Sequence, residues 1–93
     1  MSNPEKLARI FNVLSVETRV RIIDLLKRRS LCVNALARVL EITPAAVSQH
    51  LRILRNAHVV TAEKRGYFVH YKINEETLTK WREAAEVLLK GKT

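Results

Sequence analysis

The stretch TPAAVSQHLRIL at positions 43–54 carries the clearest structural signal in the chain. Thr43 is a residue type that caps helix N-termini, and Pro44 follows at the first helical position, where its missing N–H costs no hydrogen bond. Apolar side chains then recur with the spacing of one helix face, at Val47, Leu51 and Leu54. The stretch therefore predicts a capped, amphipathic helix whose other face carries small and polar residues.

A second, shorter helix is predicted just upstream, over residues 33–40, and Glu41-Ile42 leave room only for a tight turn between the two. This arrangement is typical of a helix-turn-helix, here residues 33–57, whose second helix enters the major groove of duplex DNA. Gln49 and Ser48 can exchange hydrogen bonds with base edges, and Arg52 can reach guanine or phosphate. The residues of this segment that we expect to contact DNA are Thr43, Ala45, Ala46, Ser48, Gln49, His50, Arg52 and Arg55.

A β-hairpin, or wing, is predicted downstream at residues 59–73, because the hydrophobic period changes there to two. Its tip is expected near Lys64, Arg65 and Gly66. The cations Lys64 and Arg65 suit the minor groove or the flanking phosphates, although a solvated turn is the simpler interpretation. The alternation of side chains places Val69 and Tyr71 in the core.

Three more helices are expected, which makes about five in all. Asn3 and Pro4 can open the first, Ser15 can cap the second, which ends in a basic run at positions 27–29, and Asn74 can cap the last. The first and last helices carry more apolar surface than a small domain can cover alone. We therefore expect a homodimer formed through Leu7, Ile10, Phe11, Leu14, Leu78, Trp81, Ala85 and Leu88. The alternative is that both helices fold back on their own core.

Length, composition and charge limit the kinds of protein that these elements can form. The 93 residues suffice for a single domain, residues 1–93, and the short apolar runs exclude a membrane span. The N-terminal residues lack a secretory signal, so we expect a cytoplasmic protein. The net charge of +8 indicates a polyanionic partner, and it is concentrated in residues 25–72, where nine Lys and Arg side chains oppose only Glu41 and Glu63.

With the residues laid out in this way, the chain resembles the ArsR/SmtB family of winged helix-turn-helix repressors over nearly its whole length. The similarity rests on residues 14–22, on residues 43–51, and on Lys64-Arg65-Gly66 with Val69-His70-Tyr71. The resemblance implies a mainly helical α+β fold that dimerises through its terminal helices. It also implies a repressor that occupies an operator and, in many members, releases it when a metal or another inducer binds. Because a two-fold dimer sets its recognition helices about one DNA turn apart, we expect this operator to be an imperfect palindrome.

The metal-binding residues of that family are incomplete here. The segment around Cys32 resembles the site of thiolate-using members, but Asn34 stands where they carry a second cysteine, and no histidine lies beyond His70. We therefore predict no metal site and no cofactor, and the inducer stays unknown. Cys32 has three interpretations: a buried or capping residue, a redox-reactive thiol, or a vestigial metal ligand.

Two function classes compete with a sequence-specific, DNA-binding transcriptional regulator. The same fold can serve as a protein- or RNA-interaction module without operator specificity. An enzyme is not expected, because the chain has no glycine-rich phosphate loop and no paired carboxylates on one face, and Cys32 lacks an evident partnership with a histidine and an acid.

Overall fold

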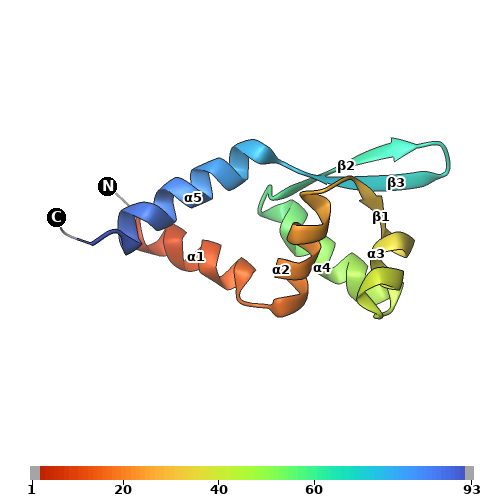
Figure 1. Cartoon of the computed structure of the whole chain (residues 1–93), viewed down its shortest axis with the longest axis horizontal. Helices are drawn as coiled ribbons and strands as arrows, with labels where there is room; N and C mark the ends of the chain where they lie inside the picture. The colour runs from red at the N-terminus through yellow and green to blue at the C-terminus, as the bar shows by residue number, and fades with distance from the viewer. Residues whose placement is uncertain (1–2, 92–93) are drawn as a thin grey trace.

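The computed structural model describes residues 3–91 and contains the elements that the sequence predicts. Figure 1 shows a mainly helical α+β fold with a long β-hairpin. The order of the elements is α1 (Pro4–Leu14), α2 (Glu17–Leu26), β1 (Leu31–Cys32), α3 (Val33–Leu40), α4 (Pro44–Asn56), β2 (Val60–Arg65), β3 (Phe68–Ile73) and α5 (Glu75–Leu89). The short strand β1 was not predicted. It pairs with β3, so the sheet has three antiparallel strands in the order β1-β3-β2.

The helix-turn-helix forms as the sequence predicts. The hydroxyl of Thr43 accepts a hydrogen bond from the backbone N–H of Ala46 at 3.1 Å and caps α4, and Pro44 takes the first helical position. The turn before it is tight because Glu41 adopts a left-handed conformation with a φ of 56°. The three apolar residues that define the predicted inner face of α4, Val47, Leu51 and Leu54, are completely or almost completely buried.

One hydrophobic core holds α2, α3, α4 and the base of the sheet together. Its fully buried large side chains are Ile22, Leu36, Val47, Leu51, Leu54, Val59 and Val60. Because this core lies directly beneath α4, it fixes the direction in which the polar face of that helix points.

The wing differs from its prediction in two details. Its turn consists of Gly66 and Tyr67, with Gly66 at a positive φ of 62° in the first position, so Lys64 and Arg65 lie in strand β2 and not in the turn. The prediction of a core position was wrong for Val69, whose side chain is 40% exposed. Val69 pairs with Lys64 near the tip, where the hairpin has passed beyond the helices that cover its base.

Two helix ends also differ from the sequence-based expectation. Ser15 closes α1, donating its hydroxyl to the carbonyl of Asn12 at 2.7 Å, and Val16 takes the N-cap position of α2. The basic run begins at Lys27, just after the last residue of α2. Asn3 caps α1 as expected, by accepting from the N–H groups of Glu5 and Lys6.

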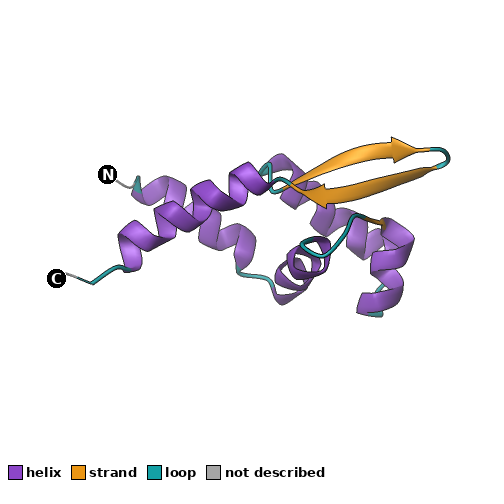
Figure 2. Cartoon of the chain, turned by 45° about the horizontal axis from the view of Figure 1, so that its top comes forward, coloured by secondary structure: helices purple, strands orange, loops and turns teal. Residues whose placement is uncertain are grey.

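The terminal helices project from the rest of the molecule. Figures 1 and 2 show α1 and α5 extending together toward the two chain ends, away from the wing. The molecule measures 51 × 22 × 21 Å, and its radius of gyration is 14.4 Å. A compact chain of this length would have a radius of gyration of about 12 Å. Within residues 3–91, no helix is both long enough and apolar enough to cross a membrane.

Candidate nucleic-acid interface

The exposed face of α4 carries most of the predicted DNA contacts. Six of them are exposed, at Thr43, Ala45, Ser48, Gln49, Arg52 and Arg55. The other two, Ala46 and His50, are half-buried. Figure 1 shows the N-terminal half of α4 and the tip of the wing at the same end of the molecule, opposite the chain termini. The buried face of α4 thus holds the helix while its polar face meets solvent at this end.

A polar groove separates α4 from the wing. It has a volume of about 350 Å³ and is lined by Ser48, Leu51, Arg52, Arg55, Asn56 and Tyr71. Asn56 was missed by the sequence reasoning, yet it lies four residues after Arg52, the spacing of one helix face. Tyr71 comes from β3, and only the folded chain brings it beside α4. Two guanidinium groups in such a groove suit a phosphate backbone.

The two cations next to the turn of the wing lie on opposite faces of the hairpin. Strand alternation places Lys64 on the same face as Ala62, whose cross-strand partner Tyr71 packs against the core beside α4. Arg65 lies on the outer face, together with Glu63. Only Lys64 therefore shares the side of the sheet on which α4 lies.

Arg65 already has a partner in the free protein. Its Nε donates to the Glu63 carboxylate at 2.7 Å, and both side chains are about half exposed. This hydrogen bond and the positive charge of Arg65 lower the pKa of Glu63, so the carboxylate stays ionised beside the arginine. One of the two wing cations that we predicted to contact DNA is thus partly neutralised before any partner binds.

The fold also brings together a row of side chains that the sequence did not connect. In the sheet, His70 is the cross-strand partner of Cys32 on one side and of Glu63 on the other, so the three residues share the outer face. Among the described residues, no three His, Cys, Asp or Glu side chains are arranged to hold a metal ion. Cys32 occupies the N-cap position of α3 but forms no side-chain capping bond with that helix, so a hydrogen-bonded cap is excluded.

The predicted dimer contacts divide into two groups. Leu7 and Ile10 are buried within the single chain, where α1 packs against α5. Phe11 and Leu88 are exposed, by 38% and 51%. The remaining four, Leu14, Leu78, Trp81 and Ala85, are half-buried. Part of this apolar surface is therefore buried inside the chain, and part is exposed to solvent.

Comparison with known proteins places this architecture among bacterial regulators. Residues 17–62 match the model of the family described as "Bacterial regulatory protein, arsR family". The chain is 37% identical over 75 residues to a cadmium resistance transcriptional regulatory protein CadC homolog of Staphylococcus aureus, covering 80% of this chain and 62% of that protein. It is 33% identical over 69 residues to the transcriptional repressor SdpR of Bacillus subtilis, covering 74% of this chain and 77% of the repressor.

Solved structures agree with these sequence matches. An ArsR-like transcriptional regulator from Rhodococcus superposes with a TM-score of 0.80 and 30% identity, covering 90% of this chain and 79% of that one. A homodimeric winged helix-turn-helix DNA-binding domain from Mycobacterium bovis superposes with a TM-score of 0.74 and 25% identity, with the same coverages of 90% and 79%. The family match spans the helix-turn-helix and the start of the wing, and the structural matches extend to the terminal helices. The chain therefore belongs to the arsR family of bacterial regulatory proteins.

Proposed function

We propose that this protein is a sequence-specific, DNA-binding transcriptional regulator that acts as a repressor. The observation that carries the proposal is the polar face of α4, which is held by a buried apolar stripe and lies at the same end of the molecule as the cationic wing. Residues 33–57 supply the base-reading unit and residues 59–73 the backbone contacts. Membership in a family of regulators supports this assignment.

The same proposal assigns dimerisation to α1 and α5. The exposed apolar side chains Phe11, Val87, Leu88 and Leu89 lie on these two helices, and the elongated shape shows how far the helices extend beyond the core. The homodimeric relative of similar fold supports this part. A two-fold dimer presents two recognition helices about one DNA turn apart, so its operator is an imperfect palindrome.

Selection of duplexes from a random pool, followed by salt-dependent gel-shift titration, tests the proposal. We expect the recovered sites to be palindromic, bound more tightly than random DNA, and bound with a steep dependence on salt. An RNA hairpin of the same sequence serves as the competitor that separates this function from RNA binding. Equal affinity for all duplexes, or preference for the RNA, would contradict the repressor assignment.

A further inference from the structure

The end of the wing carries three consecutive apolar side chains that are exposed. Tyr67 is fully exposed, and Phe68 and Val69 follow it at 54% and 40% exposure. A soluble surface avoids such a run unless the residues make a contact. Phe68 is the cross-strand partner of Arg65, and Val69 is the partner of Lys64. The wing tip, residues 64–69, therefore combines apolar and cationic side chains on one narrow projection.

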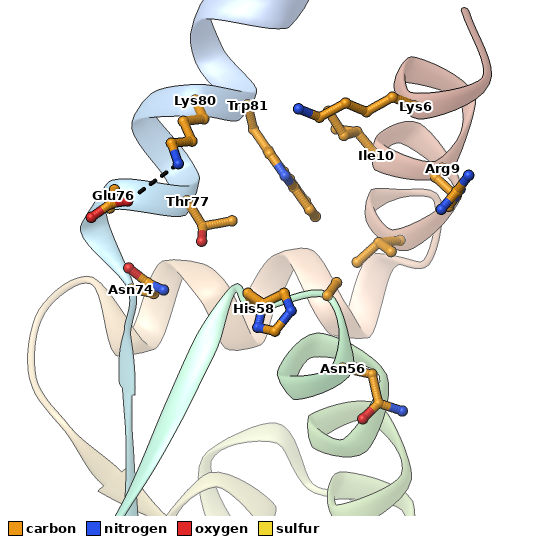
Figure 3. Close-up of a pocket in the computed structure, with 12 residues that line it drawn as sticks. Lys6, Arg9, Ile10, Asn56, His58, Asn74, Glu76, Thr77, Lys80 and Trp81 are labelled. Carbon is orange, nitrogen blue, oxygen red and sulfur yellow. Dashed lines mark ion pairs between the residues drawn. The ribbon is translucent and has the colours of Figure 1, made fainter. Parts of the chain in front are cut away.

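Neither the turn nor the core explains the tyrosine. Of the two turn residues only Gly66 has a positive φ, so the second position accepts any L residue and does not require an aromatic one. Trp81 shows the contrast: its ring stands between α1 and α5 in Figure 3 and packs against the core. An aromatic ring stabilises the fold only when it is buried, and folding buries none of Tyr67.

The place of the wing tip in a dimer follows from the shape of the chain. Figure 1 shows the tip at the end of the molecule opposite α1 and α5, along a length of 51 Å. If α1 and α5 lie at the two-fold axis, the two wing tips are the outermost parts of the dimer. They then meet the flanks of the operator, beyond the major-groove segments that the two α4 helices occupy. The minor groove there is about 6 Å wide, which admits a single side chain at the apex of a turn.

From these observations we propose that Tyr67 is an aromatic wedge that enters the minor groove at each flank of the operator, partly unstacks one base step and bends the duplex. This inference rests on the proposed function and extends it to the shape of the DNA. Lys64 and Arg65 lie on opposite faces of the hairpin, so each cation can reach the phosphates of a different strand.

The tyrosine hydroxyl and the wedge favour the same DNA sequence. The minor-groove edge of an A·T pair presents only acceptors, N3 of adenine and O2 of thymine, to which a hydroxyl can donate. Pyrimidine–purine steps are the easiest to unstack and kink. A TA step satisfies both conditions. We therefore expect duplexes selected by this protein to carry a TA step on each flank, outside the two palindromic half-sites.

Energy transfer between dyes at the two ends of a selected operator measures the bend. We expect the wild type to bend the duplex by about 20° or more at each wing. Tyr67→Ala should remove most of this bend and weaken operator binding about tenfold. Because no charge is lost, the slope of the logarithm of affinity against the logarithm of salt concentration should not change. The variant should also melt at the wild-type temperature, since Tyr67 is fully exposed.

Matched variants separate a wedge from a general contact of the wing tip. Tyr67→Phe keeps the ring and should keep the bend. Phe68→Ala removes the neighbouring exposed ring from the outer face of the hairpin, and should keep the bend with affinity changed less than about twofold. Loss of the bend in Tyr67→Phe would show that the hydroxyl acts alone, and equal loss in Phe68→Ala would show that Tyr67 is not the wedge. Either result overturns the proposal.

Replacing each flanking TA step by the stiffer AA step tests the coupling between side chain and DNA. We expect about fivefold weaker binding of the wild type and less than about twofold weaker binding of Tyr67→Ala. Equal losses in the two proteins would contradict a wedge at that step.

The remaining outcomes distinguish this inference from the proposed function. If the wild type binds no duplex, both are overturned. If it binds its operator but leaves it straight, or if Tyr67→Ala bends the operator equally, only the wedge is overturned. A basic, aromatic tip also suits an anionic membrane, but its position beside the polar face of α4 favours DNA. Cosedimentation of the wild type with phosphatidylserine vesicles, lost in Tyr67→Ala, would assign the tip to a membrane and overturn the wedge.

Discussion

The body of the molecule and its terminal helices use apolar residues in opposite ways. Helix α4 buries three side chains, Val47, Leu51 and Leu54, within 13 residues. Helix α5 has 15 residues and buries none across Glu75–Leu89. Burying an aliphatic side chain contributes about 1.5–3 kcal/mol. The body therefore completes its hydrophobic core inside one chain, whereas the terminal helices leave Phe11, Val87, Leu88 and Leu89 exposed.

This contrast teaches how a small chain divides two tasks. A helix that reads DNA must be held rigidly, so its support comes from residues that are nearby in the same chain. In the proposed dimer, a helix that joins two copies must keep apolar side chains outside its own core, and α5 leaves Val87, Leu88 and Leu89 exposed.

Truncating one leucine in each region should have very different effects on the monomer. We expect Leu51→Ala to lower the free energy of unfolding by about 3 kcal/mol. The leucine side chain is only 1% exposed, so its removal leaves a cavity beneath α4. Leu88→Ala, at a side chain 51% exposed, should cost less than about 0.5 kcal/mol. Denaturant unfolding at concentrations where the chain is monomeric measures both. Similar losses would remove the distinction between the two regions.

A charge placed on the terminal helices should separate the subunits and leave the body folded. Phe11→Glu is expected to raise the dimer dissociation constant by about 100-fold, because a carboxylate would be buried in the interface. Sedimentation equilibrium measures the constant, and circular dichroism checks the fold. The control is Asn12→Glu, which adds the same charge at an exposed neighbouring position of α1. If the control dissociates the dimer equally, the apolar face containing Phe11 is not the interface.

Within the DNA-binding end, helix and wing should contribute different kinds of binding energy. Arg65→Ala should weaken binding to every duplex about tenfold, since it removes the proposed phosphate contact. It should also reduce by about 1 the slope of the logarithm of affinity against the logarithm of salt concentration. Gln49→Ala should change the preferred sequence and leave the slope unaltered. Gel-shift titrations on the selected operator and on random DNA measure both quantities. Loss of sequence preference in Arg65→Ala, or identical effects of the two changes, would show that their roles are wrongly assigned.

The smallest expected effect concerns the ion pair on the wing. Glu63→Gln frees Arg65 and removes a negative charge near the tip, so operator binding at low salt should tighten about threefold.

The lowered pKa of Glu63 predicts that its stabilising contact is complete above its ordinary pKa of 4.5 and is lost as the pH falls through the lowered value. The free energies of unfolding of the wild type and of Glu63→Gln should become equal only in that acidic range. Convergence near neutral pH would contradict a lowered pKa.

The sequence by itself determined the five helices, the hairpin and the apolar face of α4, but not strand β1. Local signals were sufficient for α4, because the Thr43 cap, Pro44 and the apolar spacing all act within one helix. The prediction for Ser15 failed because two helices share a short connection, and its hydroxyl can bond backward to Asn12 as easily as forward. Strand alternation likewise holds for Val69, but the helices that would bury it end before that point of the hairpin.

Only the tertiary structure decided which distant residues meet. It placed Tyr71 beside α4, aligned Cys32 and His70 across the sheet, and set Lys64 and Arg65 on opposite faces of the wing. It also showed that Leu7 and Ile10 are buried inside the chain while Phe11 stays exposed, which the spacing alone could not distinguish. The physical reason is that periodicity fixes the apolar face of a helix, whereas its neighbours in space determine how much of that face is covered.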